Sequence, residues 1–477
     1  MKNIKKIIFP LSLVLLLAAC RSNSGETSKN NSSESKSEAS SVVSSSSSAA
    51  TTSTESTESS VESISSSEAP APKNIVLVEP EDTSMLTENC KAYIDDVRAS
   101  IGDDVDPYKY HEIALNIEDS TKAYLDTGDV DGQNRTVSGK IPNRSDKSLG
   151  VDLHFESSLD LEPSDYKVLV SLDENDFSKA KEYDVGEGFS VNVKNLFVNT
   201  EYYWKVVSDA EESEVGSFTT GDYPRWITCR SLTGEEEGRG IYNVRDLGGY
   251  MTESGQRVKQ GLVYRGGEIT TMTSSGHYNT ITQVAKKAFR EDMGMVGGVE
   301  LDLRGASDIS DGYKACGFAE DGDIEYVQKA IKSYEQTFTQ PNNDDARQMV
   351  RDIFEILKNA DQKPVYFHCF GGADRTGTIG FMLNGLLGVS YEDLVIDFEL
   401  TSYSSINNEH IRNHLDGHQH QYDRWPKLIQ QIQTDTTGGY AWDDDALLMD
   451  NIENYLVKAC GVPQETIDTI RDIMLED

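Results

Sequence analysis

The stretch that decides the fold of the C-terminal half is "HCFGGADRTG", residues 368–377, in which Cys369 stands six positions before Arg375. The preceding run "KPVYFHC" is short, apolar and aromatic, and it predicts a buried strand that ends at Cys369. After Arg375, apolar residues recur with the spacing of a core-facing helix: Ile379, Met382, Leu383, Leu386 and Leu387. We therefore expect a loop that runs from the end of a strand to the N-terminus of a helix.

A loop in this position suits a phosphate group. Gly371 and Gly372 permit positive φ and a close approach, and the helix dipole adds to the attraction of an anion. Arg375 supplies a planar fork that binds two phosphate oxygens together. The backbone N–H groups can surround a tetrahedral dianion, which predicts phosphate contacts from Phe370, Gly371, Gly372, Ala373, Asp374 and Arg375.

The same electrostatic field favours a thiolate at Cys369. The pKa of a cysteine at such a site can fall from about 8.5 to roughly 3.5–7.5, which makes the sulfur an anion ready to attack phosphorus. Thr376 can then donate a hydrogen bond to the sulfur when Cys369 leaves, and His368 is expected to order the loop rather than to act as a base. The competing interpretation is a buried apolar thiol. A nucleophilic Cys369 is favoured because the strand, the two glycines, Arg375, Thr376 and the helix all occur in the expected order around it.

The stretch "HCFGGADRTG" resembles the phosphate loop of cysteine-dependent tyrosine phosphatases, and its Asp-Arg-Thr-Gly ending resembles that of the atypical secreted bacterial tyrosine and phosphoinositide phosphatases. Similar segments follow in that family's order: "NVRDLGGY" (243–250), "LVYRGGEI" (262–269), "ELDLR" (300–304) and "NYLVKACGVPQETIDTIRDIML" (454–475). The resemblance implies an α/β fold with a mixed, largely parallel sheet flanked by helices. It also implies hydrolysis of phosphate monoesters through a phosphocysteine intermediate, with no cofactor and no metal.

The general acid is less clearly indicated by the sequence. Departure of an alkoxide or phenoxide needs a proton donor. The resemblance suggests Asp374, beside Arg375, and Asp302 of "LDLR" is the second candidate. A structural role for Asp374, accepting backbone hydrogen bonds that hold the loop, remains open.

One departure from the family pattern affects the substrate. Members that hydrolyse inositol lipids typically carry Lys where this chain has Ala373. The missing ammonium favours phosphotyrosine over a polyphosphorylated inositol ring, with a phosphoinositide or inositol phosphate as the alternative substrate. Arg245 and Arg265 are candidates to compensate, although a structural ion-pair role is the stronger interpretation of both.

An antiparallel β-sandwich is expected before this region. Apolar residues alternate with polar ones in several short runs separated by turn residues: Val151 to Phe155, Tyr166 to Leu172, Val191 to Val193 and Tyr202 to Val206. "NLFVNTEYYWKVV" (195–207) and "VGSFTT" (215–220) resemble the later strands of a fibronectin type III-like domain. Asn74 to Pro80 is the candidate first strand, with "LTENCKAYIDDVRASI" (86–101) inserted as a helix. The sequence here favours a spacer or interaction module.

The N-terminus resembles a bacterial lipoprotein signal. Lys2, Lys5 and Lys6 precede an apolar run, and "LAAC" places small residues directly before Cys20, the expected lipidation site. An ordinary secretory peptide or an uncleaved anchor is the alternative, and every alternative puts the rest of the chain outside the cytoplasm. The Ser-, Thr- and Glu-rich segment that follows cannot repay its ordering entropy, which predicts a disordered tether.

These observations predict four segments. They are a lipoprotein signal (1–19), a tether (20–72), a fibronectin type III-like sandwich with a helical insertion (73–222) and a cysteine-dependent phosphatase domain (223–477). The net charge of −37 argues against a nucleic-acid partner, because it would repel phosphates over most of the surface.

Two further sets of residues were weighed as ligands or crosslinks. His410 and His414 lie one helical turn apart in "EHIRNHLDGHQH", but no Cys or carboxylate set completes a metal site, and this segment is expected to form a helical lid. The chain has no CxxC pair, so neither a zinc ribbon nor a disulfide scaffold is indicated. The sequence leaves open whether Cys90, Cys229, Cys316 and Cys460 form disulfides, and it does not indicate which of them would pair.

Two functions compete at this stage. The first is a lipid-anchored enzyme at the bacterial surface, acting on phosphorylated protein or a small phosphate ester. The second is a surface binding protein whose phosphatase domain is vestigial. Retention of both Cys369 and Arg375 favours the enzyme.

Overall fold

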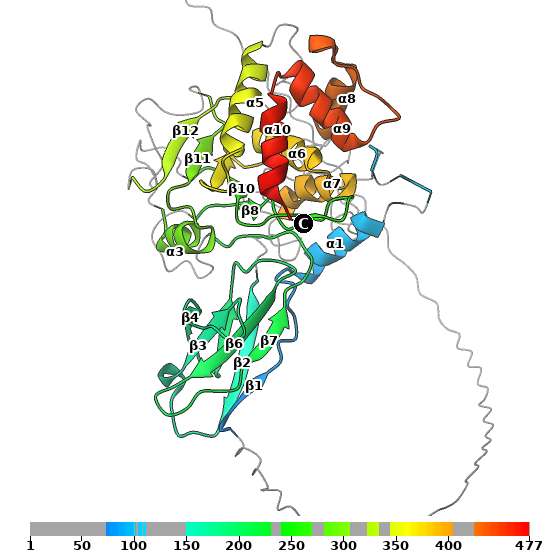
Figure 1. Cartoon of the computed structure of the whole chain (residues 1–477). Coiled ribbons are helices and arrows are strands. Elements are labelled where there is room, and N and C mark those ends of the chain that lie inside the picture. The colour runs from blue at the N-terminus through cyan, green and yellow to red at the C-terminus, as the bar shows by residue number, and fades with distance from the viewer. Residues whose placement is uncertain are drawn as a thin grey trace, which may run out of the picture. The chain divides into compact units, whose positions relative to one another are not determined.

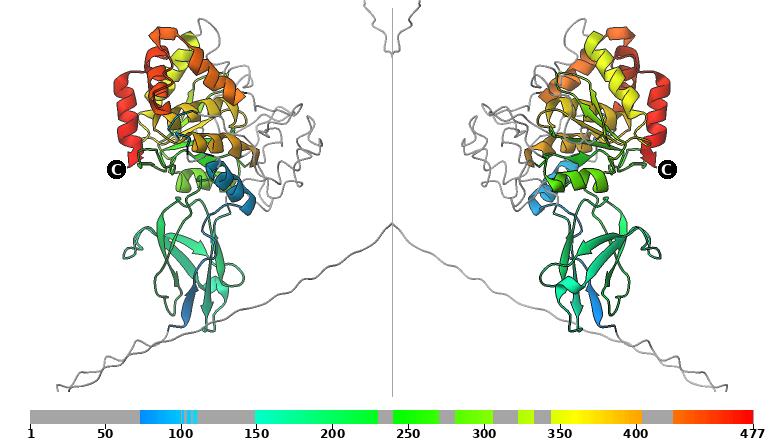
Figure 2. Two further views of the ribbon diagram at one scale, coloured as in Figure 1. Left: turned by 90° about the vertical axis from the view of Figure 1, so that its right-hand side faces the viewer. Right: turned by 90° about the vertical axis from the view of Figure 1, so that its left-hand side faces the viewer.

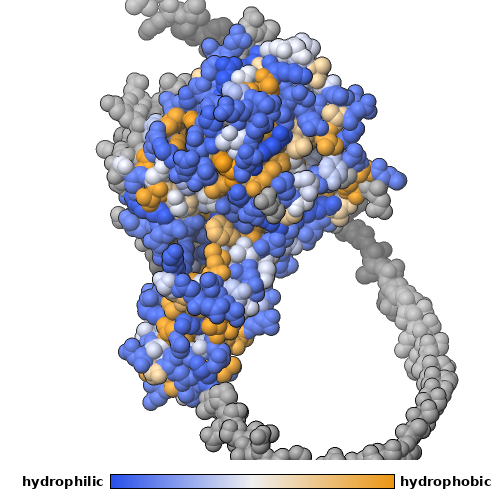
Figure 3. All heavy atoms as spheres, in the orientation of Figure 1, coloured by the Kyte–Doolittle hydropathy of each residue, from blue (hydrophilic) through white to orange (hydrophobic). Residues whose placement is uncertain are grey.

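The computed structural model describes residues 73–99, 101, 104–106, 108–110, 149–229, 240–269, 281–305, 322–332, 344–403 and 424–476. The expectations for Cys20, the tether, Cys316 and the histidine-rich segment fall outside these ranges. Within them, no helix combines the length and apolarity needed to cross a membrane. On the face drawn in Figure 3, hydrophilic residues predominate and apolar ones form small scattered groups.

A five-stranded sheet carries the C-terminal α/β region, residues 225–476 (Figure 1). Adjacent strands are parallel except at one edge, where β8 pairs antiparallel with β10. The sheet is therefore mixed and largely parallel, as predicted. Its order is β12 (Glu325–Gln328), β11 (Val299–Asp302), β13 (Val365–His368), β10 (Val263–Gly266) and β8 (Arg245–Asp246).

Helices cover both faces of this sheet because its strands alternate between two hydrophobic clusters. Along β13, Val365 and Phe367 join the cluster under the larger helical layer, while Tyr366 joins a second cluster with α3 (Gln283–Lys287). Figures 1 and 2 show α3 apart from the larger layer. That layer contains α5 (Asp344–Leu357), α6 (Asp374–Leu386), α7 (Tyr391–Glu399), α8 (Arg424–Thr434), α9 (Leu448–Asn454) and α10 (Gln464–Met474).

Short elements complete this region. Single π-helical turns follow α3 at Ala288–Asp292 and α9 at Tyr455–Ala459, and 3-10 turns occur at Leu400–Tyr403 and Thr437–Gly439. The pair β9 (Arg257–Val258) and β14 (Leu475–Glu476) ties the end of the chain back to the region's start.

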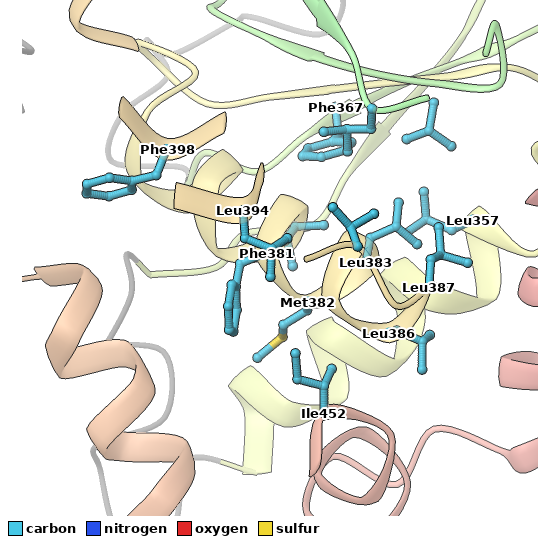
Figure 4. Packing of buried hydrophobic residues seen from close by; sticks show 14 of the residues in the cluster. Leu357, Phe367, Phe381, Met382, Leu383, Leu386, Leu387, Leu394, Phe398 and Ile452 are labelled. Carbon is cyan, nitrogen blue, oxygen red and sulfur yellow. The ribbon is translucent and has the colours of Figure 1, made fainter. Parts of the chain in front are cut away.

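The helix after the cysteine loop, α6, is buried on every side rather than along one stripe. All residues from Thr376 to Leu386 are buried. Figure 4 shows its apolar side chains packed against neighbours that include Ile452 of α9. A Cβ at Gly385 would lie 2.3 Å from the Ile452 side chain, so the absence of a side chain there lets α9 approach closely. The periodicity predicted the helix but not its second packing partner.

The β region, residues 75–78 and 151–219, contains two antiparallel sheets around one hydrophobic cluster. As predicted, Val151, Leu153 and Phe155 of β2 are buried. Leu172 is instead 56% exposed, because β3 ends at Ser171 and the alternation stops there. One sheet has the order β1 (Ile75–Val78), β2 (Val151–Ser157), β5 (Ser190–Val193), and the other β4 (Lys181–Asp184), β3 (Lys167–Ser171), β6 (Glu201–Val207), β7 (Gly216–Thr219). A 3-10 turn lies at Pro163–Asp165.

The predicted inserted helix is α1, Glu88–Ala99. Its buried residues join the main cluster of the α/β region, not that of the β region: Cys90, Tyr93, Ile94 and Val97. Arg98 forms a 3.0 Å ion pair with Asp393 of α7. This helix is thus part of the α/β core although it precedes the β strands in the chain.

Arg225 joins the β5–β6 loop to the α/β region. Its buried guanidinium donates to the carbonyl oxygens of Asn195 at 2.8 Å and Leu196 at 3.0 Å, and to the Asp246 carboxylate at 2.7 Å. It also lies 4.2 Å from the centre of the Phe197 ring. A buried arginine is stable only with this full set of partners, so the loop and the α/β region constrain each other.

Among the cysteines open to disulfide pairing, Cys460 is a buried free thiol. Burial raises the pKa of Cys460 to about 12, so it is protonated and inert at neutral pH. Cys90 and Cys229 are also buried.

Candidate active site

The ten-residue stretch forms the predicted connection between a strand and a helix. Strand β13 ends at His368, α6 begins at Asp374, and Cys369 between them is 3% exposed. Gly372 has φ of +67°, and a Cβ there would lie 2.3 Å from the carbonyl carbon of Gly266. Only glycine allows the loop to turn this tightly against β10. The N-cap residue, Ala373, provides no side-chain cap for α6.

The Cys369 sulfur is electrostatically unlike an ordinary buried thiol. Burial alone raises its pKa, but Arg375 and, next to it, Thr376 outweigh burial, so the pKa is lowered. The Thr376 hydroxyl is buried and has no hydrogen-bond partner among the described residues, so the guanidinium is the cause on which this direction rests. Cys460 is equally buried and has a raised pKa instead. Arg347 and Arg351 also act to lower the pKa of Cys460, but burial outweighs them there. At Cys369, Arg375 and the backbone amide of Thr376 outweigh burial instead.

Hydrogen-bond donors from other segments hold the carbonyl groups of the loop. The Asn243 side-chain amide donates to the carbonyl oxygens of Gly371 at 3.1 Å and Gly372 at 3.2 Å. Arg265 donates to the Gly372 oxygen at 2.8 Å, and the backbone amide of Glu268 donates to the Phe370 oxygen at 3.0 Å. Because the N–H and C=O of a peptide point in opposite directions, carbonyls fixed outward leave the amides directed inward.

Asp397 of α7 organises these supporting arginines. It accepts from Arg245 at 3.0 Å and from Arg265, and both arginines are buried. Burial lowers the pKa of Arg245 to about 10, while the same two arginines hold the pKa of Asp397 below its usual value against the effect of its own burial. Both arginines therefore have the structural ion-pair role that the sequence favoured. An acidic residue within the apolar run "LVIDFEL" was the unused sequence signal for Asp397.

His368 lies behind the loop and bonds to it, as expected. Its Nδ1 is 3.0 Å from the Cys369 carbonyl oxygen and its Nε2 is 3.0 Å from Glu300 Oε1. Burial lowers the pKa of His368, but Asp302 and Glu300 raise it by more. Two facing acceptors match an imidazolium that donates from both nitrogens. Glu300 was not singled out from the sequence.

Asp302 is held as a carboxylate. Arg304 donates to its two oxygens at 2.9 and 2.7 Å, and the Tyr326 hydroxyl donates at 3.0 Å. Burial raises the pKa of Asp302, but His368 and Arg304 together lower it below the usual value. Arg304 also pairs with Glu268 at 2.6 Å. The residue is thus fully engaged in an ion-pair network beside the loop.

No group of His, Cys, Asp and Glu within the described ranges could hold a metal ion. The histidines at 410, 414, 418 and 420 are outside those ranges.

Comparison with known proteins gives the family. The model described as "Tyrosine phosphatase family" matches residues 237–476, half of the chain, and the chain belongs to this family. It is a tyrosine-phosphatase-like hydrolase that acts on a phosphorylated substrate.

Among solved structures, one similar chain is the core catalytic domain of the PP-IP phosphatase SIW14 from S. cerevisiae, in complex with citrate. It is 14% identical, with a TM-score of 0.20, over 36% of this chain and 90% of that chain. No curated protein matches the chain significantly.

The lowered pKa predicts how Cys369 reacts with iodoacetamide. The thiolate is the reactive form and is present above the pKa, so the alkylation rate should fall as the pH is lowered, with a midpoint below the ordinary cysteine value of about 8.5. Arg375→Ala should move that midpoint upward. Mass spectrometry of the Cys369 peptide measures the rate, with buried Cys460 as the unreactive internal control. A wild-type midpoint at or above about 8.5 would contradict the assignment.

Gly372→Ala is expected to disable the loop. The new Cβ would clash with Gly266, so the loop must shift, and a displacement of about 1 Å at a reacting centre can cost roughly a hundredfold in rate. Gly297→Ala is the matched control, because Gly297 has φ of +81° and no atom within 4 Å of the added Cβ.

Each of the two changes should cost about 1–3 kcal/mol of stability from backbone strain. Only Gly372→Ala should also lose phosphatase activity, measured as kcat/KM. Equal activity in the two variants would show that the tight turn is dispensable.

Proposed function

We propose that this chain hydrolyses phosphate monoesters through a phosphocysteine intermediate, with phosphotyrosine as the favoured substrate. The observation that carries the proposal is the geometry of the loop: Cys369 directly follows strand β13, and Arg375 lies in the first turn of α6. The lowered pKa of Cys369 agrees with this placement. A buried thiolate beside Arg375 is a nucleophile matched to an anionic substrate.

The reaction has two balanced steps. Cys369 attacks phosphorus, the P–O bond to the ester oxygen breaks, and that oxygen leaves with a proton from the general acid. Water then attacks the phosphocysteine, gives a proton to the same carboxylate and releases inorganic phosphate, while Thr376 stabilises the departing thiolate. Arg375 and the inward amides neutralise the charge of the transferring group in both steps.

Asp374 is the better of the two proton donors. Asp302 has a lowered pKa and donors on both oxygens, and a locked carboxylate has no proton to give at neutral pH. Asp374 is partly exposed at the start of α6, five residues after Cys369. That position lies within the loop, next to Arg375.

A singly phosphorylated substrate fits the charges of the described residues better than a polyphosphorylated one. Ala373 is 1% exposed and carries no charge at the position where inositol-lipid phosphatases typically have Lys. The arginines that were candidates to compensate, Arg245 and Arg265, are committed to Asp397. An inositol phosphate or phosphoinositide remains the alternative substrate and is an outcome of the test below.

We further propose that the enzyme acts outside the cytoplasm, held at the cell membrane by lipid on Cys20. The basic, apolar and small-residue pattern before Cys20 supports this location. In this arrangement residues 21–72 are the tether, and the β region is a fibronectin type III-like sandwich that serves as spacer or interaction module. Its two antiparallel sheets around a shared cluster support the sandwich.

The function is tested with a panel of phosphotyrosine peptide, phosphoserine peptide, phosphoinositide and inositol polyphosphate. Wild-type protein should hydrolyse the phosphotyrosine peptide with the highest kcat/KM, and Cys369→Ser should lose turnover on every substrate. Activity that survives in Cys369→Ser would rule out the thiolate mechanism. A preference for the inositol compounds would keep the mechanism and overturn the substrate assignment.

In the same assays, Asp374→Asn should lower kcat by about a hundredfold for phenyl phosphate, whose phenoxide is a poor leaving group. The decrease should be far smaller for p-nitrophenyl phosphate, because p-nitrophenoxide leaves more readily without a proton. Asp302→Asn should affect both substrates alike, because it weakens the ion-pair network rather than proton transfer.

Lipid anchoring is tested by Cys20→Ser in cells. The wild-type chain should sediment with membranes and the variant should be lost from that fraction. Sedimentation of both proteins to the same extent would exclude Cys20 as the attachment point.

A further inference from the structure

Phe370 is an exception within the loop. Cys369, Gly371, Gly372 and Ala373 are all buried, whereas Phe370 between them is 41% exposed. It is among the few large apolar side chains that the described structure leaves in solvent. Burying such a ring would be worth about 1.5–3 kcal/mol, so its exposure is not explained by stability.

A hydrogen bond holds the backbone of Phe370, so the point from which the exposed ring projects is fixed. The Phe370 carbonyl oxygen accepts from the Glu268 amide at 3.0 Å. The main chain is therefore part of the ordered loop, and only the side chain is left to face outward. Neighbouring Cα atoms are about 3.8 Å apart, so the ring begins one residue from the nucleophile.

We propose that the Phe370 ring is the contact that selects an aromatic phosphate ester, by packing against the phenyl ring of phosphotyrosine while its phosphate lies in the loop. This inference rests on the proposed function and adds a specificity-determining residue to it. The phenyl ring of an aryl phosphate is joined to phosphorus through a single oxygen atom. Aromatic rings pair favourably with centroids about 4.5–7 Å apart, a distance that a side chain adjacent to Cys369 can reach.

The charges of the described residues also favour selection by an aromatic contact. Near the loop, Arg245 and Arg265 face Asp397, and Arg304 faces Asp302 and Glu268. The chain as a whole carries a net charge of −37, which opposes a polyanionic ligand. An aromatic contact needs no additional cation, so it can discriminate between monoesters where charge does not.

The test compares Phe370→Ala, Phe370→Tyr and the control Val296→Ala. Val296 is 59% exposed and precedes β11, which runs parallel to β13, so it lies at the opposite end of the sheet from Cys369. The readouts are KM and kcat for a phosphotyrosine peptide, and the inhibition constant of inorganic phosphate, which has no ring. Circular dichroism checks that each variant is folded.

Phe370→Ala should raise KM for the phosphotyrosine peptide about tenfold, the size expected from losing one aromatic pair. The inhibition constant of phosphate should stay within about twofold, since the cradle is intact. Phe370→Tyr should restore the wild-type KM, and Val296→Ala should match wild type throughout.

Two results would overturn the inference. Parallel increases in KM and in the phosphate inhibition constant would show that Phe370 only shapes the loop, and unchanged constants would show that its ring makes no contact. Both leave the proposed function standing if Cys369→Ser is inactive. Turnover by Cys369→Ser would instead remove the proposed function itself.

Discussion

Stabilising an anionic sulfur inside the protein is the constraint on which the site depends. A charge taken out of water costs several kcal/mol unless nearby groups replace its hydration. Arg375 and the Thr376 amide do so at Cys369, and its pKa is lowered despite burial. At Cys460 burial outweighs the nearby Arg347 and Arg351, and the pKa is raised to about 12. The same donors that stabilise the thiolate suit a phosphate group, so nucleophile activation and substrate binding share one set of atoms.

The donors can act only if the loop keeps one shape, and a second layer of buried polar residues provides this. Asn243 and Arg265 fix carbonyl oxygens of the loop, and Asp397 fixes Arg265. On the other side, His368 links the Cys369 carbonyl to Glu300. Buried ion pairs contribute little net stability compared with apolar packing, but they impose a specific geometry. Here that geometry directs the backbone amides inward.

Local patterns predicted much of the fold. The strand β13, the helix α6 and the need for glycine at Gly372 all follow from neighbouring residues, because strand pattern, helix stripe and turn chemistry are properties of short segments. The alternating pattern wrongly predicted a buried Leu172, because the strand ends before it. The apolar stripe predicted one buried face of α6 and not the second face, which packs against Ile452. The helix α1 joins the α/β core because of contacts with α7, which its own sequence does not encode.

By itself, the sequence indicated Cys369, Arg375 and the loop that joins them, since all lie within ten consecutive residues. Tertiary structure alone decided which distant groups support them. Asp397 meets Arg245 across 152 residues and Arg265 across 132, and Glu300 meets His368 across 68. These pairs exist because the order of the strands places β8, β10, β11 and β13 side by side. Strand order depends on the packing of the whole sheet, and no single segment carries it.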